Sequence, residues 1–231
     1  MRDVYRRYAL ERPDLSGILL PDLLPHDACA VASWRPGRVK MLYVAESPPW
    51  AAGRREVAES ADCRDPGYPY FWNDRYDAPH RPGAAPLSRG LAENLFSLLG
   101  LDGGSRRENL ALFSGKGLYL VDTVRCVFRK NRKAAIPADL IRMSARDTLA
   151  PEIAALAPDY VVALGNTATT ALRHIEPYAS ALSGAGRVTS PFPEVIFEES
   201  HLLCLPYPGW RNRRYLASIE SGFEILRDLA G

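Results

Sequence analysis

The chain has 231 residues, of which 47% are hydrophobic and 24% are charged, which is enough apolar material for the full core of one α/β domain. The formal net charge of +2 excludes a polycation, so any affinity for nucleic acid must come from local clusters of basic side chains. No apolar run approaches the roughly 20 residues that span a bilayer, and the charged amino terminus lacks the apolar core of a signal peptide. We therefore expect one cytoplasmic, monomeric domain over residues 1–231, without membrane contact.

Four continuously apolar segments predict the strands of a parallel sheet, because strands that are buried on both faces do not alternate. They are Val39–Val44, Leu118–Val124, Tyr160–Leu164 and Leu202–Leu205.

Helices are expected between and after these strands. The apolar pattern predicts a helix over Leu87–Leu99 and another over Ile136–Ala157, which Pro151 should kink or split. A last helix is predicted at the carboxyl terminus, because Leu216, Ile219, Phe223 and Leu226 fall on one helical face. Strand, helix and strand alternate, so the sequence predicts a three-layer αβα fold around a central four-stranded parallel sheet.

The cysteines predict neither a disulfide framework nor a metal site. Cys29, Cys63, Cys126 and Cys204 are widely scattered, without any C-x-x-C pair, whereas structural zinc sites need closely spaced ligands. We expect no metal and no other cofactor.

Polar segments follow each predicted strand. They are Glu46–Ser47, Arg125–Lys133, Gly165–Asn166 and Pro206–Arg214. Ligands of open α/β sheets bind beyond the carboxyl ends of the strands, so these segments should converge on one cleft. The long segment Pro48–Pro86 is rich in prolines and aromatic residues, which favours an ordered loop over that cleft.

The first polar segment places a carboxylate and a hydroxyl, Glu46 and Ser47, where a buried strand ends in Pro48 and Pro49. Such a loop could position a water molecule for attack on a substrate. A strand-to-loop turn with a solvated glutamate is the alternative.

The second segment combines a buried acid with a basic run. Asp122 lies inside an apolar strand, where an unpaired carboxylate is costly, so it should face the cleft, cap a backbone or meet a partner. The basic residues that follow, among them Arg125, Arg129, Lys130 and Arg132, could hold phosphates or form a solvated loop.

The third segment is a stiff Pro-Gly loop that carries Trp210, Arg211, Arg213 and Arg214. An aromatic wedge with phosphate contacts is one way to hold distorted DNA. A tryptophan packed on the sheet edge, with its arginines in solvent, is the alternative.

Taken together, these segments resemble the motifs of the uracil-DNA glycosylase superfamily, especially its thermostable prokaryotic branches. The motif G-E-A-P-G resembles residues 45–49, and G-x-P-F resembles residues 67–70. The strand motif T-N-V-V-K-C resembles residues 121–126, with Asn131 and Arg132 after it. The motif P-x-x-I-v-x-L-G-x-x-A resembles residues 158–168, and H-P-S followed by R-N resembles residues 205–207 with 211–212.

The resemblance implies roles for individual residues. Glu46 and Ser47 match the water-positioning motif, Tyr70 matches the aromatic residue that stacks on the extruded base, and Phe71 and Asn131 are expected to contact the substrate beside it. Asp122 takes the place of the asparagine that reads uracil, and Leu205 takes the place of the histidine that stabilises charge on the base. The iron–sulfur cluster of a related branch is not expected: Cys126 matches one ligand position, but the paired amino-terminal cysteines are missing and Ala145 lies near another ligand position.

Two of these replacements bear on function. An ionised aspartate only accepts hydrogen bonds, so Asp122 should favour a base that presents an N–H or amino donor. Leu205 offers neither a proton nor a charge, which removes a donor worth about 10²–10³ in rate. The resemblance therefore implies a uracil-DNA glycosylase-like protein that excises an aberrant base from damaged or mismatched DNA, with altered base specificity. The alternatives are a catalytically inactive DNA- or nucleobase-binding member of the same fold and, more remotely, an enzyme outside the superfamily.

Overall fold

The computed structural model describes residues 1–25, 33–49, 68–76, 86–87, 90–128, 135–183, 195–197 and 200–231, with backbone alone at 195–197 and 210. A central sheet has the strand order β3-β2-β5-β7-β6. Its strands are β2 (Met41–Ala45), β3 (Leu118–Asp122), β5 (Tyr160–Leu164), β6 (Val195–Phe197) and β7 (Leu202–Leu205).

The four predicted strands are present and mutually parallel, in the order β3-β2-β5-β7. Every residue of β2, β3 and β7 is buried, which explains their continuously apolar sequences, since helices cover both faces of such a sheet. Strand β6, which the apolar pattern did not indicate, pairs with β7 in antiparallel fashion at the edge.

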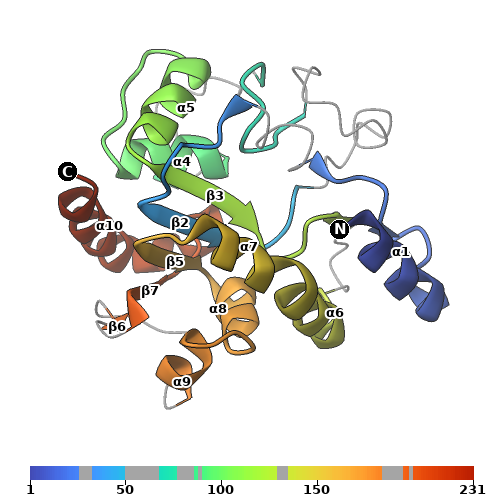
Figure 1. The fold of residues 1–231 in the computed structure, drawn as a ribbon. Coiled ribbons are helices and arrows are strands. Elements are labelled where there is room, and N and C mark those ends of the chain that lie inside the picture. Colours follow the sequence, from blue (N-terminus) through green and yellow to red (C-terminus); the bar gives the residue numbers. More distant parts are fainter. Residues whose placement is uncertain are drawn as a thin grey trace.

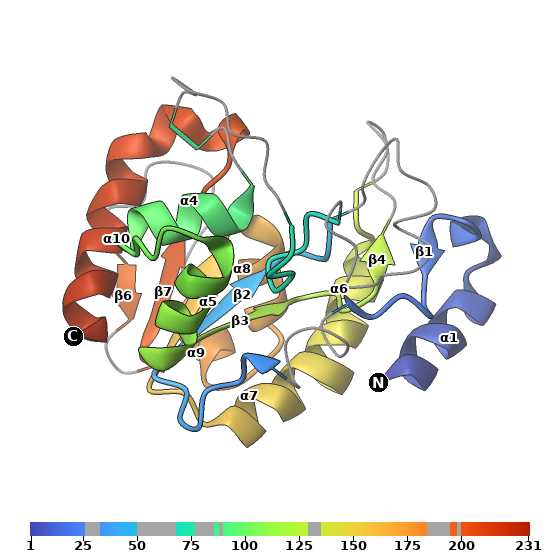
Figure 2. The same ribbon diagram turned by 90° about the horizontal axis from the view of Figure 1, so that it is seen from above.

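Helices form the outer two layers (Figure 1). One face of the sheet carries α4 (Leu91–Leu98), α5 (Arg106–Gly115) and α10 (Leu216–Ala230), and the other carries the helices between β3 and β7, as Figure 2 shows from above. The latter are α6 (Ala138–Ser144), α7 (Ala150–Leu156), α8 (Asn166–Leu172) and α9 (Tyr178–Leu182). This arrangement is the predicted three-layer αβα fold.

The predicted interruption near Pro151 takes the form of a π-helical turn, η2 (Ala145–Leu149), between α6 and α7. Proline lacks the N–H that an α-helix would donate four residues back, and a wider turn is one way to accommodate that loss.

A smaller apolar cluster lies beside the sheet. It joins α1 (Arg2–Glu11), the 3₁₀ turn η1 (Pro13–Leu15), and the short antiparallel strands β1 (Leu19–Leu20) and β4 (Val127–Phe128). Its buried members include Tyr5, Leu19 and Phe128. Because β4 comes shortly after β3, this cluster supports the chain that leaves the central strands. None of the described helices combines the length and the apolar character that crossing a membrane requires.

The strand order reverses between β2 and β5. The chain proceeds from β2 outward to β3, crosses back to β5, and then continues to β7. Such a reversal opens a crevice beyond the carboxyl ends of the two central strands.

Candidate active site

A cleft of about 850 Å³ lies at the carboxyl edge of the sheet, where the reversal of strand order opens the crevice. Its described lining comprises residues 45–49, 69–71, 90–94, 106, 120, 122, 128, 164–167, 206–209, 211–212 and 214–215. The ends of β2, β3 and β5 and the loop after β7 therefore meet there. These include three of the four polar segments expected to converge, namely those that begin at Glu46, Gly165 and Pro206.

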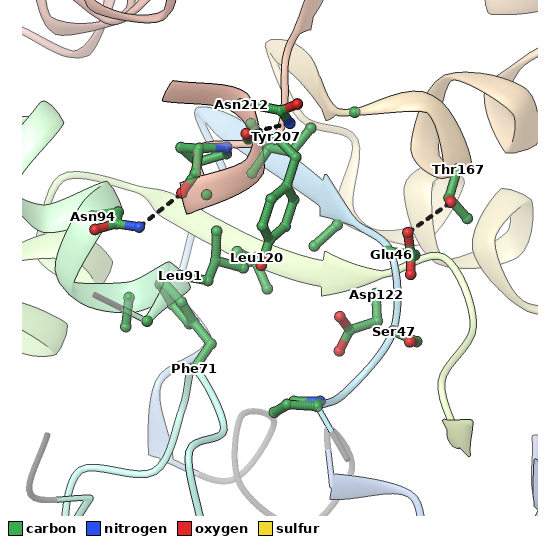
Figure 3. Close-up of a pocket in the computed structure, with 18 of the residues that line it drawn as sticks. Glu46, Ser47, Phe71, Leu91, Asn94, Leu120, Asp122, Thr167, Tyr207 and Asn212 are labelled. Carbon is green, nitrogen blue, oxygen red and sulfur yellow. Dashed lines mark hydrogen bonds between the residues drawn. The ribbon is translucent and has the colours of Figure 1, made fainter. Parts of the chain in front are cut away.

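Asp122 forms part of the floor of the cleft. Asp122 is 3% exposed, and its carboxylate points into the open space of the cleft (Figure 3). The Tyr70 hydroxyl donates a hydrogen bond of 3.0 Å to Asp122 Oδ2. Burial raises the pKa of Asp122 to about 6, against the opposing effects of the Arg125 charge and the Tyr70 hydrogen bond. The carboxyl group therefore changes charge close to neutral pH.

Glu46 and Asp122 come from the ends of neighbouring strands. Asp122 pairs in register with Ala45, and the pairing extends further because the Thr123 N–H donates to the Ala45 carbonyl at 2.8 Å and the Val124 N–H to the Glu46 carbonyl at 3.0 Å. These bonds fix the backbone that carries both carboxylates.

The Glu46 side chain turns toward the first turn of α8. Thr167 Oγ1 donates to Glu46 Oε2 at 2.9 Å, and Figure 3 shows this bond at the side of the cleft opposite Phe71 and Leu91. Ser47 also lines the cleft, but its side chain points away from the Asp122 carboxylate in the same view.

Tyr70 and Phe71 form an aromatic wall that is held by Arg106 of α5. The Arg106 guanidinium donates to the carbonyls of Tyr70 at 2.6 Å, Phe71 at 3.0 Å and Asn73 at 2.7 Å, and it forms an ion pair with Glu93. Phe71 also packs edge-on against Trp72 with ring centroids 4.8 Å apart. The wall is therefore rigid before any ligand arrives.

Tyr207 extends into the cleft from the loop after β7 (Figure 3). Its carbonyl accepts hydrogen bonds from the Gly209 N–H and from Asn212 Nδ2, both at 2.8 Å. Gly165, with φ of 84°, and Gly209 leave room for it, because a Cβ at either position would lie 3.0 Å or less from Tyr207 atoms. Burial, and then the charge of Asp122, raise the pKa of Tyr207 to about 12.

The structure corrects the expectation for Leu205, which is wrong as a residue that borders the cleft. Leu205 is buried and packs on Gly222 of α10, where an added Cβ would lie 2.4 Å from Leu205 Cδ2. It is absent from the described lining of the cleft. Its position inside β7 directs the side chain into the layer of α10, and Tyr207, two residues later, enters the cleft instead.

The expectation that Arg125 holds phosphates is also wrong. Arg125 has no exposed surface, and its guanidinium forms an ion pair with Glu152 of α7. A buried cation of this kind needs a partner within the protein, and the Arg125 charge also acts on Asp122.

The remaining predicted DNA contacts divide into two groups. Arg211 lines the mouth of the cleft and is exposed, and Arg213 is exposed next to it. Arg129, Lys130, Asn131 and Arg132 lie outside the described residues, as does the side chain of Trp210.

The described residues contain no group of three or more histidine, cysteine, aspartate or glutamate side chains that could hold a metal ion. Cys126 lies in the small apolar cluster around α1, where burial raises the pKa of its thiol. Ala145, beside which the resemblance puts another cluster ligand, is buried and apolar. These residues do not fit an iron–sulfur cluster.

Sequence reasoning missed several residues of the cleft. Three of them come from segments whose neighbours in space are distant in sequence, namely Arg106, Thr167 and Tyr207. A fourth, Asn94, belongs to an amphipathic helix and donates to the Pro208 carbonyl at 2.8 Å. Two of them had a signal: Tyr207 belongs to the segment Pro206–Arg214 that was expected at the cleft, and Thr167 lies at the start of α8, three residues after β5 ends.

Chemically, the cleft combines aromatic walls with two carboxylates at one end, an arrangement suited to a flat ligand that has polar edges. The sequence model of a protein family described as "Uracil DNA glycosylase superfamily" matches residues 77–229, two thirds of the chain. The matched region contains Asp122, Thr167 and Tyr207, whereas Glu46 and Tyr70 precede it. No curated protein gave a match.

Proposed function

Because the chain belongs to the uracil DNA glycosylase superfamily, we propose that it binds a base extruded from DNA and hydrolyses the N-glycosidic bond of that base. The substrate is an aberrant base in damaged or mismatched DNA, and the reaction belongs to base excision repair. We expect the protein to act as a monomer.

The observation that carries this proposal is the buried Asp122 carboxylate at the floor of an aromatic cleft. Tyr70 donates to Asp122 Oδ2, which leaves Oδ1 to accept a hydrogen bond from a ligand. Extruded bases are read through their edges and stacked between aromatic or apolar side chains, and Asp122 with the Tyr70–Phe71 wall supplies both kinds of contact.

An ionised Asp122 sets the base specificity. It accepts hydrogen bonds and does not donate them, so it favours a base with an N–H or amino group at the edge it reads. It disfavours uracil, whose O4 edge is itself an acceptor. Asp122→Asn restores an amide with both functions and should shift the preference toward uracil.

Glu46 is proposed to act on the attacking water. The water oxygen bonds to the sugar carbon C1′ while the C1′–N bond breaks, the bonding electron pair leaves with the base, and a water proton passes to the Glu46 carboxylate. Thr167 holds Glu46 Oε2, so the carboxylate is oriented before the substrate binds. General base catalysis of this kind contributes about 10²–10⁴ in rate.

The DNA backbone is proposed to lie along the basic residues at the mouth of the cleft. Arg211 and Arg213 are exposed there, and Arg129, Lys130 and Arg132 add cationic charge in the sequence. Contacts of this kind give affinity that depends strongly on salt and weakly on sequence.

A second candidate is binding without hydrolysis. It is favoured by the composition of the described lining, which includes no histidine. In that case the cleft would hold an extruded base or a free nucleobase and release it unchanged.

One experiment separates the two candidates. Duplex oligonucleotides that carry uracil, hypoxanthine, xanthine or a mismatch are incubated with the protein, and alkali then cleaves any abasic sites. We expect cleavage of at least one damaged duplex, lost in Glu46→Gln and retained in Glu220→Gln, which alters an exposed carboxylate of α10. Binding of these duplexes without any cleavage would select the second candidate.

A further inference from the structure

Tyr207 carries a hydroxyl group that the hydrogen bonds within the site do not use. The ring reaches into the cleft, and its tip lies between Leu91 and Asp122 in the view of Figure 3. The charge of Asp122 acts on its hydroxyl. In the part of the chain that the structure describes, this hydroxyl makes no side-chain hydrogen bond. The Tyr207 carbonyl, in contrast, accepts two hydrogen bonds.

Hydrolysis of a glycosidic bond creates a need for such a donor. The base leaves with the bonding electron pair and carries negative charge, which an ionised Asp122 beside it would repel. A hydrogen-bond donor placed where that charge develops lowers the barrier, because the donor is oriented in advance.

Five other donor side chains of the described cleft are already committed. Tyr70 donates to Asp122, Thr167 donates to Glu46, and Asn94, Asn212 and Arg106 donate to backbone carbonyls. The Ser47 side chain points away from the Asp122 carboxylate. Tyr207 therefore combines an available proton with a position beside the acid that would read the base.

We infer that Tyr207 is a catalytic residue, whose hydroxyl donates a hydrogen bond to the base as the C1′–N bond breaks. This inference rests on the proposed hydrolysis. The hydroxyl keeps its proton during the step, the electron pair of the broken bond stays on the base, and the base takes a proton from solvent after it has left.

Two features of the site fit this role. The raised pKa keeps the hydroxyl protonated throughout the neutral range, so it is a lasting donor and not a base. The carbonyl bonds of Tyr207, with the close packing of its ring on Gly209, fix the ring, and a fixed donor loses little entropy when the charge develops.

Tyr207→Phe tests the inference, because it removes one oxygen atom and keeps the ring. Single-turnover excision is measured on the duplex whose base the unaltered protein releases fastest in the panel of uracil, hypoxanthine and xanthine. Affinity is measured on the same duplex with a 2′-fluoro sugar, which resists hydrolysis. We expect the rate to fall by about 10²-fold, as for loss of one preorganised donor, while affinity changes by less than about threefold.

The control is Tyr160→Phe, which removes a hydroxyl at the opposite end of β5, where the ring stacks on His201. Its rate should match that of the unaltered protein, and thermal unfolding verifies that both variants are folded. A rate unchanged in Tyr207→Phe, or a rate and an affinity that fall together, would overturn the role of Tyr207 and leave the proposed function intact. Absence of excision by the unaltered protein would instead overturn both.

Discussion

The Tyr70 hydroxyl and the Asp122 carboxylate share a hydrogen bond of 3.0 Å at the floor of the cleft, and both residues are almost fully buried. The bond favours the ionised form of Asp122, and burial opposes that form more strongly, so the pKa settles at about 6. The ionisation of Asp122 therefore affects both the stability of the fold and the hydrogen bonds that the cleft can accept.

Asp122→Asn should therefore alter stability in a manner that depends on pH. Below about pH 3 the carboxyl group is protonated in both folded and unfolded chains, and the folded state bears no cost of ionisation. Between about pH 4 and pH 6 the unfolded chain has released the proton that the folded chain still holds, so the protein progressively loses about 2 to 3 kcal/mol that the asparagine variant retains. Urea unfolding of both proteins between pH 4 and pH 8 measures this difference, and a difference that is constant across that range would contradict the prediction.

Arg106→Met should destabilise the protein by about 3 to 5 kcal/mol, because the variant leaves Glu93 without its partner in a buried setting and deprives three carbonyls of their donor. The matched control is Arg107→Met, whose side chain is 77% exposed and lies 3.9 Å from Asp74. We expect a change of less than about 0.5 kcal/mol there. Denaturant titrations of the two variants provide the comparison, and equal effects would show that Arg106 does not hold the aromatic wall.

Arg125→Met should also be destabilising, by about 3 to 5 kcal/mol, since it removes the buried cation that pairs with the Glu152 carboxylate. Combining it with Glu152→Gln should recover part of that loss, and a double-mutant cycle measures the coupling. In the folded variant, the salt dependence of DNA affinity should match that of the unaltered protein, because Arg125 has no exposed surface. A flatter salt dependence would instead place Arg125 on a phosphate.

Neutralising Arg129, Lys130 and Arg132 together should weaken DNA binding through lost phosphate contacts. The slope of log affinity against log salt should flatten by about one unit for each contact removed. Titrations at four or more salt concentrations measure the slope. The control is Arg38→Gln, at the far end of the sheet, where the arginine pairs with Asp159 at 2.9 Å. A triple variant with an unchanged slope would remove this loop from the DNA interface.

The sheet and the approximate position of the cleft were predictable because they depend on local patterns. A strand buried on both faces is apolar throughout, and polar residues at its carboxyl end face the same edge as those of its parallel neighbours. The identity of Asp122 as an acid among apolar residues pointed to the cleft for the same reason.

The direction of individual side chains was not predictable, because partners distant in sequence determine it. Leu205 faces α10 because Gly222 leaves room for it. Arg125 is buried because it forms an ion pair with Glu152, which lies 27 residues later in the chain. Neither Gly222 nor Glu152 carries any local mark of that role, so a motif match could assign the position of each residue but not its surroundings.

The hydroxyl group of Tyr5 ties α1 to segments that are made much later. It bonds Ser144 at 2.6 Å and accepts the Arg125 N–H at 2.9 Å, and Ser144 in turn donates to the Thr123 carbonyl. During synthesis, α1 leaves the ribosome more than 100 residues before these partners. Until they emerge, its apolar face is exposed to solvent or is covered by another protein. The segment just after β3, next to Asp122, can therefore be completed only when most of the chain has emerged, and nascent chains stalled before residue 144 should be the ones that chaperones retain.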